Sequence, residues 1–152
     1  MVSNITLSIG LIANCFEDID RLAVAHHAEV NVFDDVPLNI NWQRYLQCEK
    51  SGNYLLVVVR DDGKIVGWLG FFIYEHMRHI GYKIAKEDWY YISPEYRGKG
   101  IGKELFRCAE WSLKSLGVRR VMVSCKVAHD HTRLLNALGY DNHEKNFTKV
   151  LT

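Results

Sequence analysis

The chain has 152 residues, of which 48% are hydrophobic and 24% are charged, values typical of one globular domain. The formal net charge of +1 argues against a broad electrostatic surface for nucleic acid or membranes. No apolar run approaches the about 20 residues that a membrane helix needs, and no signal pattern is visible at the N-terminus. The four cysteines form no CxxC pair and have no histidine at zinc-finger spacing. We therefore expect reduced thiols, no metal and a cytoplasmic protein with one domain over residues 1–152.

Strands and helices alternate along the chain, as the spacing of apolar residues indicates. Runs of β-branched and aromatic residues indicate strands, and apolar residues every three or four positions indicate helices. In chain order, the patterns predict a strand over 4–10, a helix over 17–30, a loop over 30–39, a helix over 40–51, strands over 54–60 and 65–76, a connection over 77–85, a strand over 86–93, a helix over 100–116, a strand over 118–127, a short helix over 129–140 and a strand over 146–151. This order predicts a mixed α/β fold whose strand–helix–strand unit over 86–127 is parallel and right-handed.

The stretch PEYRGKGIGKEL, residues 94–105, is both glycine-rich and basic. Its glycines and cations are Arg97, Gly98, Lys99, Gly100, Gly102 and Lys103. A helix start exposes unpaired backbone N–H groups at the positive end of the helix dipole, and glycines before it let the backbone wrap around a bound group. The stretch therefore predicts a phosphate-binding loop, with a solvated turn that binds no ligand as the alternative.

Two common phosphate-binding motifs do not fit this stretch. A Walker A loop needs Ser or Thr after the Gly-Lys pair, and Glu104 stands there. The GxGxG spacing also differs from the GxGxxG of dinucleotide-binding folds.

The stretch YYISPEYRGKGIGKEL resembles the acetyl-CoA signature of the GNAT superfamily of N-acetyltransferases. Arg97, Gly100 and Gly102 match the core of that signature, and LGVRRVMVSC and HTRLLNALGY resemble the strand and helix that follow it. The resemblance is specific from about residue 86 to 140. It implies a single GNAT-like domain with a central, mostly antiparallel twisted sheet, a parallel and splayed strand pair, and flanking helices.

The resemblance also implies acetyl-CoA as co-substrate and positions for its binding. Backbone N–H groups from about 97 to 103 would hold the pyrophosphate, and the strand ending at Ile92 would pair with the pantetheine arm. The asparagine that often begins the family's last helix is missing, and Asp130 or His131 stands in its place. The coenzyme-binding residues that we expect are Ile92, Arg97, Gly98, Lys99, Gly100, Ile101, Gly102, Lys103, Asp130 and His131. For Asp130, an N-terminal helix cap is an equal alternative.

Acetyl transfer to an amine needs a group that takes a proton, since a lysine-like amine has a pKa near ~10.4. We consider the carboxylates Glu75, Glu87 and Asp88. Strand alternation places Asp88 on one face with Tyr90 and Ile92, and places Glu87 on the other face with Trp89 and Tyr91. The family's carboxylates often lie on this strand, so Asp88 is the first choice of base and Glu75 the second.

The family's usual acid tyrosine is replaced by Leu135, which leaves water, Tyr90 or Tyr91 as the acid. The sequence thus predicts an acetyl-CoA-dependent transferase that acts on a primary amine of a small molecule or a protein. The alternative is an inactive coenzyme A-binding or protein-interaction module on the same fold. We expect no nucleic-acid or membrane partner, and a homodimer is left open. Residues 17–51 and 77–85, which would select the acceptor, do not identify it.

Overall fold

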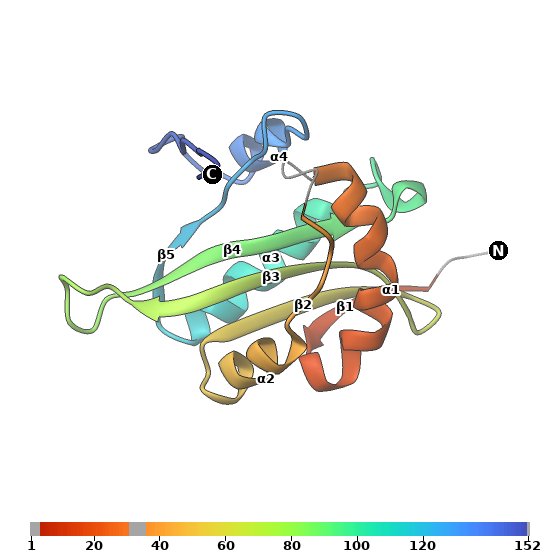
Figure 1. Cartoon of the computed structure of the whole chain (residues 1–152), viewed down its shortest axis with the longest axis horizontal. Coiled ribbons are helices and arrows are strands. Elements are labelled where there is room, and N and C mark those ends of the chain that lie inside the picture. The colour runs from red at the N-terminus through yellow and green to blue at the C-terminus, as the bar shows by residue number, and fades with distance from the viewer. Residues whose placement is uncertain (1–3, 31–35, 152) are drawn as a thin grey trace.

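A five-stranded sheet with the order β1-β2-β3-β4-β5 forms the centre of the computed structural model, which describes residues 4–30 and 36–151 (Figure 1). The strands are β1 (Ile5–Gly10), β2 (Tyr54–Asp61), β3 (Lys64–Glu75), β4 (Lys83–Ile92) and β5 (Val118–Met122). The helices are α1 (Ile12–Val30), α2 (Trp42–Lys50), the 3-10 turn η1 (Pro94–Tyr96), α3 (Ile101–Ser115) and α4 (Thr132–Ala137). Helices α1 and α2 cover one face of the sheet and α3 covers the other (Figure 1).

The β4–β5 pair is the only parallel pair of the sheet in the described residues, and it is short. Strands β1 to β4 are antiparallel neighbours, whereas β5 lies parallel to β4. The pairing runs only from Lys83↔Val118 to Lys86↔Met122. Beyond Met122 the chain leaves β4, and Figure 1 shows it running toward α4 while β4 continues along the sheet. The expected mixed fold, with its parallel and splayed strand pair, is confirmed.

Two hydrophobic clusters lie on opposite faces of the sheet. On the α3 face, Leu105, Phe106 and Leu113 are fully buried against aliphatic strand residues. The α1/α2 face is rich in aromatic residues, which are Tyr54, Trp68, Trp89 and Tyr91 from the strands, with Trp42 and Tyr45 from α2 packed against them. The near-continuous burial of β2 and β3 follows from having helices on both faces.

Several element boundaries differ from the sequence prediction. Helix α1 begins at Ile12, whose backbone N–H donates to Glu49 Oε1 at 2.7 Å. Strand β5 ends at Met122 because the following residues have left the edge of β4 and have no ladder partner. The strand predicted over 146–151 is wrong, since these exposed residues are irregular and pair with no strand. Part of the predicted loop over 30–39 lies at 31–35, outside the described residues.

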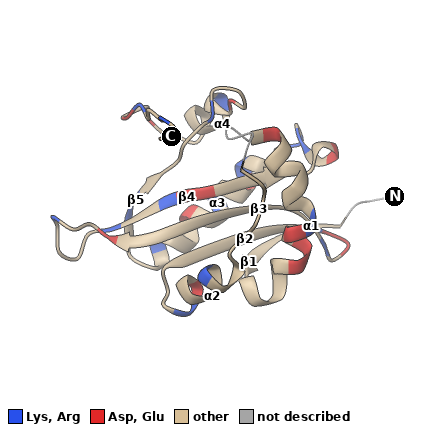
Figure 2. Cartoon of the chain, in the orientation of Figure 1, with Lys and Arg blue, Asp and Glu red and all other residues tan. Residues whose placement is uncertain are grey.

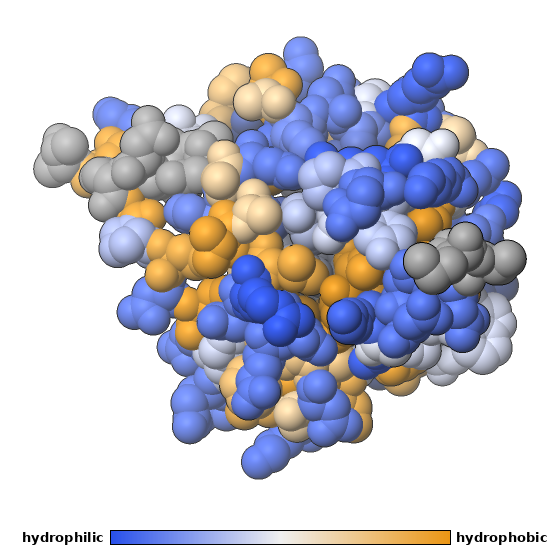
Figure 3. Space-filling model, turned by 90° about the vertical axis from the view of Figure 1, so that its right-hand side faces the viewer, coloured by the Kyte–Doolittle hydropathy of each residue, from blue (hydrophilic) through white to orange (hydrophobic). Residues whose placement is uncertain are grey.

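Charge and hydropathy are mixed over the surface. Acidic and basic residues are interspersed rather than gathered by sign (Figure 2), in keeping with the net charge of +1. The side seen in Figure 3 is mainly hydrophilic, with hydrophobic side chains over part of it. No helix in the described part of the chain is both long and apolar enough to span a membrane.

Candidate active site

A β-bulge in β4 decides which side chains face which side of the sheet. Gly70 pairs with Trp89 and Phe71 pairs with Glu87, so Asp88 is an extra residue between two pairs. The bulge breaks the alternation that the sequence predicted. Asp88 lies on the α1/α2 face with Trp89, whereas Glu87 lies on the α3 face, like its partner Phe71. The predicted faces of these two carboxylates are therefore wrong.

Gly70 leaves room on β3 for the side chains of Tyr54 and Trp89. A Cβ added there would overlap the Tyr54 hydroxyl and would lie 2.9 Å from the indole ring of Trp89. The absence of a side chain therefore lets Tyr54 reach across the sheet toward Asp88.

Asp88 is tied into a hydrogen-bonded group of aromatic residues. Its Oδ2 accepts hydrogen bonds from the Tyr45 hydroxyl at 2.7 Å and from the Tyr54 hydroxyl at 3.1 Å. The Tyr54 hydroxyl in turn accepts one from Trp89 Nε1 at 2.8 Å. Burial raises the pKa of Asp88, and the two tyrosine hydroxyls oppose this by stabilising the carboxylate. This carboxylate is thus already engaged by two donors.

Glu87 lines the cleft that opens where β5 leaves β4. The cleft has a volume of about 220 Å³ and lies between α1, β4 and the loop before α4. Both Glu87 and Asp88 line it, and the other lining residues include His26, Tyr90, Lys126, His129 and His131. Glu87 is half-buried there, and the Ser124 N–H donates to its Oε2 at 3.5 Å. Burial raises the pKa of Glu87 to about 7. A carboxyl group with this pKa exchanges a proton readily near neutral pH, as a general base must.

Tyr90 lies on the same face as Glu87 and reaches the start of α3. A Cβ added at Gly102 would overlap the Tyr90 hydroxyl, so this hydroxyl touches the first turn of the helix. Burial raises the pKa of Tyr90 to about 12, which keeps the phenol protonated at neutral pH. The His131 ring lies 5.4 Å from the Tyr90 ring, and both of its nitrogens are buried without a hydrogen-bond partner. Burial lowers the pKa of His131.

The glycine-rich stretch forms the loop that enters α3, as the sequence predicted. Gly98 and Gly100 have φ of 73° and 80°, in the left-handed region that favours glycine. Gly100 is the N-cap of α3, and no side chain caps the helix there. The first backbone N–H groups of α3 are thus available to an anion, with Lys99 and Lys103 nearby in the sequence.

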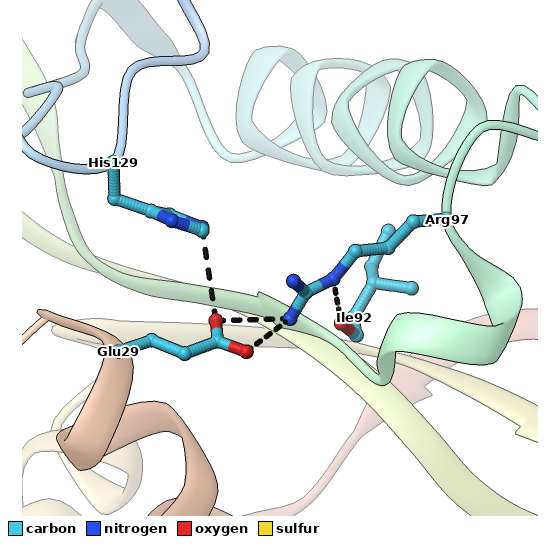
Figure 4. Close-up of polar contacts among 4 residues, drawn as sticks. All are labelled: Glu29, Ile92, Arg97 and His129. Atoms are coloured by element: carbon cyan, nitrogen blue, oxygen red, sulfur yellow. Dashed lines mark hydrogen bonds and ion pairs between the residues drawn. The ribbon is translucent and has the colours of Figure 1, made fainter.

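Arg97 connects this loop to β4 and to α1, as Figure 4 shows. Its Nε donates to the Ile92 carbonyl oxygen at 2.6 Å, and its Nη2 lies 2.8 and 2.9 Å from the two carboxylate oxygens of Glu29. The guanidinium also lies 5.6 Å from the centre of the Tyr91 ring. His129 Nε2 is 3.7 Å from Glu29 Oε2. Nothing in the sequence marked Glu29, because it comes from a helix far away in the chain.

Two of the predicted site residues have local structural roles. Glu75 Oε1 accepts from the Gly81 N–H at 2.9 Å, and Glu75 pairs with Lys83 at the end of β4 where β5 is still attached. The structure therefore does not bring Glu75 to the cleft. Asp130 Oδ1 accepts hydrogen bonds from the backbone N–H and the hydroxyl of Thr132 at 2.8 and 2.5 Å. Asp130 thus binds the first residue of α4, although His131 and not Asp130 is the N-cap of that helix. Within residues 4–30 and 36–151, no group of three or more potential metal ligands occurs.

The splayed strand pair and the glycine loop that opens α3 define an acetyltransferase fold of the GNAT type. Residues 17–140 match the acetyltransferase (GNAT) family, so the chain belongs to this family and is an acyltransferase. No curated protein sequence matches the chain significantly.

Solved structures share the fold at low sequence identity. An aminoglycoside acetyltransferase from an uncultured soil metagenomic sample has a TM-score of 0.76 at 16% identity, over 97% of both chains. Glucosamine-6-phosphate N-acetyltransferase from Arabidopsis thaliana has a TM-score of 0.73 at 17% identity, covering 98% of this chain and 99% of that one. Ribosomal-protein-alanine N-acetyltransferase from Brucella melitensis has a TM-score of 0.75 at 14% identity, covering 97% of this chain and 99% of that one.

Proposed function

We propose that the protein transfers the acetyl group of acetyl-CoA directly to a primary amine. The observation that carries the proposal is the placement of Glu87, a carboxyl group with a pKa of about 7, in the cleft between β4 and the departing chain. The uncapped start of α3 and the Tyr90 hydroxyl lie at the same end of β4. A proton acceptor, a protonated phenol and an anion-binding helix start are therefore close together.

The residues of the loop fit the phosphates of coenzyme A. The left-handed Gly98 and Gly100 keep side chains off the path of the backbone, and Gly102 leaves room beside Tyr90. The residues that we propose to hold the coenzyme are Ile92, Arg97, Gly98, Lys99, Gly100, Ile101, Gly102 and Lys103. Acetyl-CoA supplies an activated thioester carbonyl. The main-chain groups of β4 beyond Lys86 have no β5 partner and so can bind the pantetheine arm.

The chemistry then needs two proton transfers within the cleft. The amine nitrogen forms a bond to the carbonyl carbon, the bond from that carbon to sulfur breaks, and Glu87 accepts the proton that the amine loses. Tyr90 retains its proton at neutral pH and donates it to the departing thiolate. We assign the base to Glu87 rather than to Asp88, because two tyrosine hydroxyls already engage Asp88. In this mechanism Asp88 positions the aromatic side chains of Tyr45 and Tyr54.

The acceptor is an amine of a small molecule or a protein. The names of the similar structures mention an aminoglycoside, a sugar phosphate and a protein alanine. The shared fold therefore does not narrow the class of amine.

The experiment that tests the proposal is the melting temperature with and without acetyl-CoA, with adenosine phosphates as controls. Acetyl-CoA at 100 times its dissociation constant is expected to add ~2.7 kcal/mol, a rise of a few degrees. The variant Gly100→Glu is expected to lose this rise, since it places a side chain and a negative charge in the loop. The matched control is Gly139→Glu, which alters another left-handed glycine (φ 86°) outside the loop. No rise in the parent protein would refute the proposal.

A second candidate is an inactive coenzyme A-binding module. It is favoured by Leu135, which is 8% exposed and packs in the core where the family usually has its acid tyrosine. Acetylation of any amine that is lost in Glu87→Gln would exclude this candidate. Binding of acetyl-CoA without turnover across an amine screen would support it.

A further inference from the structure

Glu29 lies beside the cleft, and its carboxylate pairs with the cation Arg97. It lies in the last turn of α1, between His26 and Val30, which both line the cleft. Its two oxygens face Arg97 Nη2, and His129, which lines the cleft, approaches one of them from another direction (Figure 4). The side chain of Glu29 is 26% exposed, so it can exchange one cationic partner for another.

Arg97 uses one edge of its guanidinium for these contacts. The Nε and Nη2 groups donate to the Ile92 carbonyl and to Glu29. The same pair of N–H groups can donate two parallel hydrogen bonds to a phosphate group. A phosphate that binds this edge must displace both acceptors, which frees the Glu29 carboxylate and the Ile92 carbonyl together.

We propose that Glu29 binds the ammonium group of a cationic acceptor. In the free protein Arg97 pairs with Glu29, and the phosphates of the bound coenzyme compete for the guanidinium and break this ion pair. The inference rests on the proposed function. Phosphate binding at the loop and cation binding at α1 then favour each other, because both require the same ion pair to open. The guanidinium in the free protein stands where the ammonium group of the acceptor binds later.

The first test measures the affinity of coenzyme A by calorimetry in four proteins: the parent, Glu29→Gln, Arg97→Gln and the double variant. Coenzyme A carries no acetyl group, so no turnover interferes. Removing the Glu29 carboxylate is expected to tighten binding about two- to fivefold, because a partly exposed ion pair no longer competes for Arg97. In the Arg97→Gln background, Glu29→Gln is expected to have no effect.

The double variant separates the ion pair from a simple effect of charge. If Glu29→Gln tightens binding equally in both backgrounds, the loss of one negative charge explains the result and the inference is overturned. Unchanged or weaker binding in Glu29→Gln alone also overturns it. The control is Glu17→Gln, an exposed carboxylate near the other end of α1, for which no change in affinity is expected.

The second test concerns the acceptor side and uses propane-1,3-diamine as a probe. In the coenzyme A complex, the parent is expected to bind the diamine more tightly than in the free protein. Glu29→Gln is expected to weaken this binding about tenfold, as for the loss of a charged hydrogen bond. Absence of diamine binding to the parent complex, or equal binding to Glu29→Gln, overturns the assignment.

The failures of the two proposals are distinguishable. If coenzyme A does not bind the parent protein, the proposed function fails. If coenzyme A binds the parent and all variants with one affinity, only the role of Glu29 fails.

Discussion

The two faces of the sheet differ in chemistry, although both are buried under helices. The α3 face is packed mostly with aliphatic side chains and supports the helix whose start faces the proposed coenzyme. The α1/α2 face combines aromatic rings with a hydrogen-bonded carboxylate and with His26. Beneath α3 the packing is mostly aliphatic, and the titratable Glu87 and Tyr90 lie on this face where it borders the cleft. The α1/α2 face instead holds a carboxylate and an imidazole among its aromatic rings.

The largest effect on stability is expected from Phe106→Ala on the α3 face. Phe106 is fully buried, so its truncation leaves a cavity that lowers the free energy of unfolding by about 3–5 kcal/mol. Urea denaturation measures the loss. The matched control is Trp111→Ala on the same helix, where the side chain is 74% exposed and a change of less than about 0.5 kcal/mol is expected. Similar losses in the two variants would contradict the assignment of the buried face.

Glu87→Gln is expected to abolish most of the catalysis without a comparable loss of stability. The amide cannot accept the proton, so kcat/KM is expected to fall by about 10²–10⁴-fold. In the parent protein, kcat/KM should rise with pH through the pKa of about 7, and this step should be missing in the variant. Glu144→Gln in the exposed tail is the control. A step near pH 7 that persists in Glu87→Gln would assign the base to another residue.

Tyr54→Phe tests the polar group on the α1/α2 face. The change removes the acceptor of the buried Trp89 N–H and one of the two donors to Asp88. A loss of about 1–3 kcal/mol in the free energy of unfolding is expected, since a buried donor is left unsatisfied. Urea denaturation of Tyr54→Phe and of Tyr74→Phe, whose side chain is exposed, gives the comparison. Equal stabilities would mean that water replaces the lost partner.

His26 gives the smallest effect, which appears as acid sensitivity. Its ring packs among Trp68, Trp89 and Tyr91, and this burial lowers its pKa from 6.5 to about 4. The unfolded chain binds the proton more tightly, so the stability of the folded state is complete above pH 6.5 and falls as the pH decreases toward 4. In His26→Gln the slope of melting temperature against pH should be shallower over this interval. An unchanged slope would mean that a group other than His26 causes the acid sensitivity.

Features that depend on neighbouring residues could be predicted from the sequence. The hairpin at Asp62–Gly63 and the helix after Gly100 are present as predicted, because left-handed backbone conformations there need glycine or a residue like Asp. Errors arose where an element depends on a distant partner. The segment 146–151 has the composition of a strand, yet it is exposed and pairs with no strand of the sheet. The start of α1 depends on Glu49, which lies in another helix.

The amino-acid sequence by itself determined the loop that enters α3, since the alternating glycines allow the left-handed turns and leave the helix start uncapped. Only the tertiary structure decided which of the two carboxylates that line the cleft is engaged by tyrosine hydroxyls. One extra residue in β4 reverses the alternation, and Gly70, opposite the bulge, leaves room for the Tyr54 hydroxyl that donates to Asp88. The pairing of Arg97 with Glu29 has the same origin, because the two residues meet only when α1 packs across the sheet. Contacts between distant residues leave no periodic trace in a single sequence, and here they place the proposed proton acceptor and the proposed cation-binding group.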